Sequence, residues 1–212
     1  MHGLVNQGLR DLVIEIGGEA LWVEIATAAD VGHESFLSMD VYPDDVTYRL
    51  VGAASAATGM SPSEVLHAFG RHWIMYTARL GYGAIFDTMG RTLPEFLGNL
   101  DAMHTRLTLS MPKLRPPSIL CEPLGGEQFR LEYRSERPGL VPMFLGLLDG
   151  LADLYDVTLS VTQTVARAEG ADHDEFLVRY RPVPSGTGPA PEPAAAARRA
   201  TPSLVTEATA DG

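Results

Sequence analysis

Apolar residues recur every three or four positions through the first half of the chain, which is the spacing of one face of an α-helix. The first such stretch is expected to stop at Gly17-Gly18, because paired glycines end helices readily, and a short helix over residues 19–27 follows it. The apolar positions of the opening helix are Val5, Leu9, Leu12 and Ile16.

Two further helices are expected to begin at capping boxes, in which a hydroxyl residue and a glutamate three positions later bond each other's backbone N–H groups. Ser61 and Glu64 open the first, and Thr92 and Glu95 open the second. The apolar face of the first helix is Leu66, Phe69, Trp73, Tyr76 and Leu80, and the stripe on the second is Phe96, Leu97, Leu100, Met103, His104 and Leu107.

The second half of the chain changes to an alternating, β-branched pattern that predicts strands over residues 129–137, 157–167 and 175–183. Three prolines exclude regular helix from residues 111–119, and the strongly apolar residues 140–157 predict a buried helix. We therefore expect an α+β domain, with a helical N-terminal half followed by an antiparallel sheet with helices.

Composition changes abruptly near Pro182, after which the chain is mostly proline, alanine, glycine, serine and threonine. Such a segment cannot bury enough apolar surface to fold by itself. We expect one folded domain over residues 1–181 and a disordered, Pro/Ala-rich tail or linker over residues 182–212.

The net charge of −11, with no dense basic run, argues against nucleic acid and anionic membrane surfaces as partners. A single cysteine, Cys121, excludes an internal disulfide and a cysteine zinc cluster. No apolar run approaches the roughly 18–20 residues that cross a bilayer, and the first residues lack the pattern of a signal peptide. We therefore expect a cytoplasmic protein.

The strand "FRLEYRSER" places polar groups on its inward face. Because side chains alternate between faces, Tyr133, Ser135 and Arg137 should point the same way as Phe129 and Leu131. A buried arginine is rare unless an acidic group pairs with it. The partner is either a protein carboxylate or the acid groups of a bound molecule.

His104 lies on the apolar stripe of its helix rather than on the solvent face. It is either a core histidine that bonds a backbone carbonyl or the proximal ligand of a haem iron, which is a neutral imidazole in apolar surroundings. Haem carries two propionates, and two hydroxyls with a guanidinium on one strand face can bind them. Together the histidine and the polar strand favour haem.

This combination of motifs, in this order, resembles the H-NOX family of haem nitric oxide/oxygen binding domains. The motifs are "MHGLVN" at the start, "NLDAMHTRL", "RPPSI", "YRSER" and the glycine of "FLGLLDG". The resemblance implies haem b buried between the helical half and the sheet. It also implies His104 as the iron ligand, Pro117 against the macrocycle, and Tyr133, Ser135 and Arg137 as propionate binders.

The resemblance also addresses gas selectivity. Oxygen-binding members carry a distal tyrosine three residues before the glycine that matches Gly146, and this chain has Met143 there. A pocket without hydroxyl donors should favour nitric oxide and carbon monoxide over oxygen, because bound oxygen needs a hydrogen-bond donor. The other pocket positions implied by the resemblance are Val5, Leu9, Trp73 and Leu147.

Beside an enzyme that uses His104 as a general base, for which no partner nucleophile is evident, two alternatives stay open. One is an oxygen-binding haem protein in which the indole of Trp73 or the imidazole of His72 donates to the ligand, although helical spacing places His72 at the surface or boundary of its helix. The other is a haem-free interaction module, in which Arg137 pairs with a protein carboxylate and His104 is a core residue.

No nucleophile–base pair or metal-hydrolysis motif emerges, so we expect a sensor rather than an enzyme. The resemblance implies that nitric oxide weakens the bond between iron and His104, and that a histidine kinase, a diguanylate cyclase or a fused guanylate cyclase reads the change. Cys121 is either a small apolar residue of a strand or a redox-modifiable thiol.

Overall fold

The computed structural model describes residues 1–32, 36–77, 86 and 88–183. A helical first half is followed by a four-stranded antiparallel sheet, which confirms the α+β prediction. The helices are α1 (Gly3–Ala28), α2 (Asp44–Thr58), α3 (Pro62–Thr77), α5 (Leu93–Ser110) and α6 (Val141–Leu154), with a short 3₁₀ turn at Arg167–Glu169. The strands are β1 (Ser118–Pro123), β2 (Gln128–Arg134), β3 (Val157–Val165) and β4 (Asp174–Pro182).

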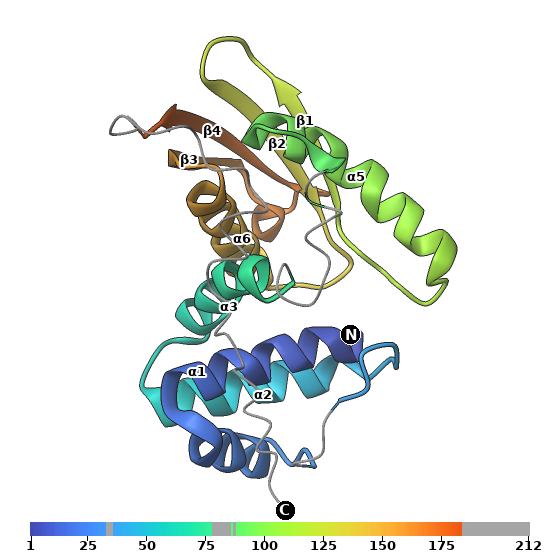
Figure 1. The fold of residues 1–212 in the computed structure, drawn as a ribbon, viewed down its shortest axis with the longest axis vertical. Coiled ribbons are helices and arrows are strands. Elements are labelled where there is room, and N and C mark those ends of the chain that lie inside the picture. Colours follow the sequence, from blue (N-terminus) through green and yellow to red (C-terminus); the bar gives the residue numbers. More distant parts are fainter. Residues whose placement is uncertain (33–35, 78–85, 87, 184–212) are drawn as a thin grey trace, which may run out of the picture.

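Figure 1 shows two lobes, with α1 and α2 in one and the sheet with α5 and α6 in the other; α3 lies between them. The strand order is β1-β2-β4-β3, and every neighbouring pair is antiparallel. Among the described residues, no helix is long and apolar enough to cross a membrane. Leu80, which was predicted on the apolar face of α3, lies outside the described residues. So do residues 184–212, which are nearly all of the predicted tail.

The opening helix breaks where the sequence predicts. Gly18 has φ 76° and ψ −178°, a conformation that only glycine adopts without strain, and it divides α1 into two arms. The capping box that opens α3 is also confirmed, since the Ser61 hydroxyl accepts the Glu64 N–H at 3.2 Å and the Glu64 carboxylate accepts the Ser61 N–H at 2.7 Å. The pattern of small residues between 44 and 58 did not predict α2.

Two glycines let α3 and α6 cross at close range. A Cβ placed on Gly70 would fall on the carbonyl oxygen of Met143, and one placed on Gly146 would fall on the carbonyl oxygen of His67. Both neighbours are backbone atoms and cannot turn aside as a side chain can. The two positions therefore fix how closely the middle helix approaches the sheet lobe.

The apolar core has two parts that meet at α3. One fills the space between α1, α2 and α3, and the other lies between the sheet, α5 and α6. Trp73 packs against both. The largest fully buried side chains are Trp22, Phe69, Leu9, Ile25 and Leu50 in the first part and Phe129, Phe176, Leu93, Leu97, Leu131 and Leu148 in the second.

Candidate functional site

β2 carries its apolar residues inward as predicted, but it ends earlier than predicted. Phe129, Leu131 and Tyr133 are buried, whereas the strand stops at Arg134. The prediction that the strand reaches Arg137 is wrong because the Ser135 hydroxyl accepts the Arg137 N–H at 3.1 Å and bends the chain into a turn. Ser135 and Arg137 are therefore presented by a turn rather than by a strand face.

The turn nevertheless keeps the three polar side chains together. Tyr133 is buried, and its ring stacks on Phe144 with a centroid distance of 4.5 Å. Burial raises the pKa of Tyr133, although a hydrogen bond with the Ser135 side chain acts in the opposite direction. The phenol therefore keeps its proton at neutral pH and remains a hydrogen-bond donor.

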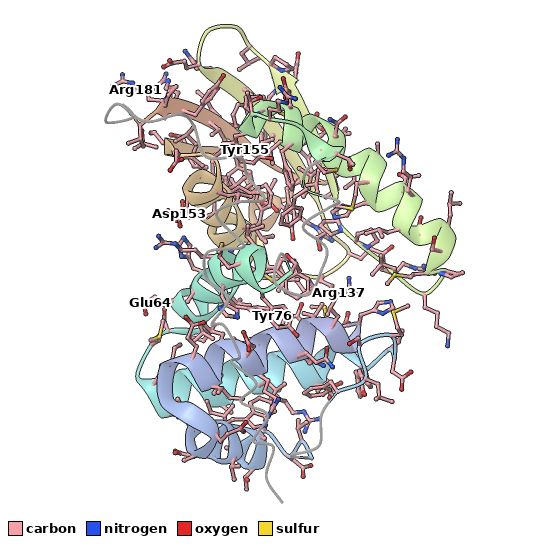
Figure 2. The ribbon with its side chains drawn as sticks, in the orientation of Figure 1. Glu64, Tyr76, Arg137, Asp153, Tyr155 and Arg181 are labelled. Carbon is pink, nitrogen blue, oxygen red and sulfur yellow. The ribbon has the colours of Figure 1, made fainter. Side chains whose placement is uncertain are left out.

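Arg137 has an acidic partner within the protein. Its Nε lies 2.8 Å from Oδ2 of Asp44 at the start of α2, and its Nη1 donates to the carbonyl of Arg115 at 2.6 Å. The N-terminal ammonium also contacts the Asp44 carboxylate. Burial acts to raise the pKa of Asp44, but hydrogen bonds from the ammonium and Arg137 outweigh it and hold that pKa below its ordinary value. Figure 2 shows Arg137 where the lobes meet.

His104 is oriented by the proline-rich segment that precedes β1. Its Nδ1 lies 3.0 Å from the carbonyl oxygen of Pro117, so Nδ1 carries the proton in this contact. Burial lowers the pKa of His104, which favours the neutral ring. Nε2 then holds a lone pair, and it has no partner among the described residues. A backbone carbonyl on one nitrogen and a free lone pair on the other is the usual arrangement of a metal-binding histidine.

The helix around His104 is fully buried only at its beginning, although Leu100 and Met103 also pack against the sheet-side core. Leu93, Phe96 and Leu97 are buried, whereas Met103 and His104 are half-buried. His104 is thus only partly enclosed, and its bond to a backbone carbonyl fits both a core histidine and an iron ligand. The other half-buried apolar residues of the predicted stripe are Leu100 and Leu107.

The two halves of the predicted site converge on one short segment. Arg137 bonds the carbonyl of Arg115, and His104 bonds the carbonyl of Pro117, two residues further along. The structure thus brings the histidine and the Tyr-Ser-Arg group to the same stretch of backbone. These residues suit haem, because they supply one imidazole lone pair and hydroxyl and guanidinium donors for acid groups.

Sequence reasoning missed two residues that organise this region. Asp44 joins Arg137 to the N-terminus. Asp101, one turn before His104, accepts the Ser118 hydroxyl at 2.7 Å and the Ile119 N–H at 3.3 Å, which ties α5 to β1. The position of Asp101, three residues before His104 and therefore on a neighbouring face, was a signal that could have identified it.

The residues predicted to line the distal pocket lie on three helices. Val5 and Leu9 are on α1, Trp73 is on α3, and Met143 and Leu147 are on α6. Leu9 is fully buried, and Val5, Trp73 and Met143 pack against the same core, while Leu147 packs against the sheet-side core. The indole N–H of Trp73 has no hydrogen-bond partner among the described residues.

His72 was predicted at the surface or boundary of its helix, and the structure corrects the first of these, because the residue is buried. It is buried where α1 packs across α3, with Nε2 at 2.9 Å from Asp11 and Nδ1 at 3.2 Å from Glu15. Its ring stacks on Tyr76. Because both ring nitrogens face carboxylates of α1, nothing in this geometry turns the imidazole toward the predicted pocket.

Cys121 lies half-buried in β1. Burial raises the pKa of its thiol to about 11. Thiolate is the reactive form of cysteine, so at neutral pH this side chain is a weakly reactive thiol. The geometry favours the apolar interpretation of Cys121 over the redox one.

An α+β fold that presents an oriented imidazole beside donors for acid groups defines a cofactor-binding domain. The family model described as haem-NO-binding matches residues 2–163. The chain therefore belongs to the haem-NO-binding family and is an H-NOX domain.

Curated relatives are soluble guanylate cyclases. Gcy-31 of Caenorhabditis elegans is 28% identical over 174 residues, which is 82% of this chain and 24% of the relative. Gcy-33 of the same organism is 30% identical over 155 residues, which is 73% of this chain and 16% of the relative. This chain thus spans about a quarter or less of the length of these relatives.

Solved structures share the fold at low identity. An H-NOX protein from S. oneidensis in the Fe(II)NO ligation state aligns with a TM-score of 0.77 and 21% identity, covering 85% of this chain and 99% of the other. An oxygen-binding H-NOX domain related to soluble guanylate cyclases aligns with a TM-score of 0.72 and 22% identity, covering 89% and 100%. Both nitrosyl and oxygen complexes therefore occur on this fold, and gas selectivity has to be argued from side chains.

Proposed function

We propose that this chain is a nitric oxide sensor that holds haem b through His104 and rejects oxygen. The observation that carries the proposal is the orientation of His104, whose Nδ1 is bound to the Pro117 carbonyl while Nε2 has no described partner. When bound, haem would supply an iron that can take a diatomic gas, and His104 would hold that iron through Nε2.

The Pro117 carbonyl prepares His104 for this role in two ways. It selects the tautomer with the proton on Nδ1, and it makes Nε2 a better electron donor by drawing on that proton. Burial acts in the same direction, because it disfavours the imidazolium and so lowers the pKa of His104. At neutral pH the ring is therefore ready to bind a metal without first losing a proton.

Tyr133, Ser135 and Arg137 are proposed to bind the acid groups of the haem. Arg137 uses Nε and Nη1 for Asp44 and the Arg115 carbonyl, and a guanidinium has further N–H donors beyond these. The Tyr133 phenol stays protonated, and Ser135 adds a hydroxyl. The contact between Arg137 and Asp44 is the one that the haem-free alternative predicts, and it is also compatible with haem, since one arginine can serve a protein carboxylate and an acid group of a ligand together.

Gas selectivity is proposed to follow from the apolar pocket positions. Val5, Leu9, Met143 and Leu147 have no donor group, and His72 is engaged with α1. Oxygen needs a donor to stabilise the negative charge that builds up on it, whereas nitric oxide and carbon monoxide need much less. Trp73 is the one proposed pocket residue with an N–H group.

The signal is proposed to travel through α5. Its fully buried residues all lie in the first turns, whereas the half that carries His104 is only partly buried and is therefore held less tightly. Once His104 is no longer held by a metal, this half can change position together with the Pro117 segment. A helix with two positions is a switch that a partner protein can read.

The partner is proposed to be a histidine kinase or a cyclase that makes a cyclic nucleotide or cyclic di-GMP. Support comes from the relatives, which are named soluble guanylate cyclases and extend far beyond the matched region. In this proposal the chain itself is a sensor and the output reaction belongs to the partner.

Absorption spectra of the purified, reduced protein under oxygen, carbon monoxide and nitric oxide test the proposal. We expect a haem spectrum that changes with carbon monoxide and nitric oxide and does not change to a stable oxygen complex in air. A stable oxygen complex would refute the selectivity and point to Trp73 as donor. A colourless protein that takes up no haemin would refute the function altogether.

A further inference from the structure

β3 forms one outer edge of the sheet, away from α5 (Figure 1). It runs for nine residues, "VTLSVTQTV", without a proline, a glycine or a charged side chain. Within the described ranges, no strand pairs with its outer side. Exposed edges of this length are normally blunted by charges, prolines or a covering element, because they invite pairing with another strand.

The other edge of the sheet shows the contrast. β1 has six residues, carries Glu122 and ends at Pro123, and α5 lies beside it. That edge therefore has the features that discourage pairing. β3 has one such feature, a register shift between Gln163 and Val165, which leaves the segment before it regular.

Hydrogen bonds to β4 establish which backbone groups of β3 face outward. The Val183 N–H bonds the Asp156 carbonyl at 2.8 Å, and the register places Val157 opposite Pro182, which has no N–H. Because bonded and non-bonded pairs alternate in an antiparallel ladder, the backbone groups of Leu159 and Val161 turn away from β4. They are available to a strand added outside β3.

A groove lies under this edge. Leu159, Val161 and Gln163 line it from β3, and Leu145 and Asp149 line it from α6. A strand added beside β3 would run about 4.8 Å away and would direct alternate side chains into this groove. The edge thus offers both backbone partners and a place for side chains.

The sequence of β3 is close to its own reverse about Val161. In an antiparallel pair of two β3 strands centred there, Val161 meets Val161, Leu159 meets Gln163, and Ser160 meets Thr162. The first two pairs lie on the groove face. The third lies on the solvent face, where the hydroxyls of Ser160 and Thr162 can hydrogen-bond to each other. A two-fold contact requires this kind of self-complementarity.

Electrostatics also favour β3 as the meeting point of two copies. The chain carries a net charge of −11, so two copies repel each other over most of their surfaces. β3 itself has no charge. We propose that β3 is a self-association edge, through which two copies of this chain join their sheets across a two-fold axis centred on Val161.

The proposal does not rest on haem or on gas binding. The paired segment is short, so the interface is small and the dimer is expected to be weak, with a dissociation constant on the order of tens to hundreds of micromolar. Added salt should tighten it, because it screens the like net charges of the two copies.

A charge swap at Ser160 and Thr162 tests the pairing. In the dimer each copy's residue 160 lies opposite residue 162 of the other, so S160K/T162K sets like charges against each other, and S160K/T162D sets opposite charges against each other. Sedimentation velocity on the full chain over a wide concentration range should show about tenfold weaker dimerisation for the first variant and recovery to at least the wild-type level for the second. Both variants place lysine opposite Arg179 of β4, so any effect on the fold from that contact is shared.

L120K on the exposed face of β1 is the matched control, since it places a charge on the opposite edge, and it should leave dimerisation unchanged. Amide exchange gives an independent readout: the amides of Leu159 and Val161 should become protected only as concentration rises, whereas that of Ser160 should be protected throughout. A chain that stays monomeric at millimolar concentration overturns the proposal. So does a dimer indifferent to the charge swap, or a monomer in which Leu159 and Val161 are already protected.

Discussion

Replacement of Asp44 by asparagine probes the contact that joins the two lobes. Asp44 receives the N-terminal ammonium of Met1, whose side chain is 7% exposed, and Arg137, whose side chain is 18% exposed. The variant keeps the size of the side chain and removes its charge. Hydrogen bonds to charged groups contribute roughly 1.5–3 kcal/mol. Asp44 itself is 40% exposed, and solvent screening reduces the expected loss of unfolding free energy to about 1–2 kcal/mol.

Asp45→Asn is the matched control. Asp45 lies in the same first turn of α2, so both variants lose the same interaction with the helix dipole. Its side chain is 67% exposed and, among the residues that the structure describes, pairs with Arg49 alone, at 3.5 Å. We expect a loss of less than about 0.5 kcal/mol. Urea unfolding at neutral pH should therefore separate the two variants by about 1 kcal/mol, or roughly 2–4 °C in Tm.

The pH dependence of this difference follows from the lowered pKa of Asp44. A carboxylate whose pKa is lower in the folded state stabilises the fold above its ordinary pKa and loses that contribution as pH falls through the folded value. The gap between wild type and D44N should thus be constant from about pH 5 to pH 8 and should shrink below about pH 4. Equal stability of D44N and D45N at pH 7 would refute the reasoning.

Three further predictions have defined outcomes. Cys121 should react with a thiol-alkylating reagent far more slowly at pH 8 than after unfolding, since its pKa is about 11; equal rates would contradict its burial. Gly146→Ala should lower the free energy of unfolding by about 2–4 kcal/mol or prevent folding, because the added methyl group meets backbone atoms. Gly52→Ala adds its methyl group in open space and should leave the stability unchanged or raise it; urea unfolding measures both variants. Met143→Tyr should give a stable oxygen complex in air, judged by absorption spectra, and Met143→Phe should not.

The elements with strong local signals were predictable from sequence. The glycine break in α1, the capping box of α3 and the alternation in β3 and β4 each appear where expected. The helix α2 was not predicted, because its buried side is made partly of small and polar residues such as Thr47 and Ala54, which give no clear apolar period. Local pattern therefore identified elements with large apolar faces and missed α2 and the short strand β1, which lack them.

The candidate site was predictable as a set of residue types and not as a set of contacts. Sequence placed an acidic partner beside Arg137 without identifying Asp44, which lies 93 positions earlier in the chain. It placed His72 at the surface or boundary of its helix, because helical spacing within α3 carries no information about α1 packing across it. Contacts between distant segments depend on tertiary packing, which no local period encodes.

Haem retention by His104→Gly tests the central claim most directly. The variant should lose haem on purification, and added imidazole, which can occupy the vacated space and supply the missing nitrogen, should restore both binding and the spectrum of the wild-type protein. His67→Gly removes a histidine at a surface contact with Asp149 and should retain haem unchanged. An H104G protein that retains haem with a wild-type spectrum and no imidazole would contradict the account.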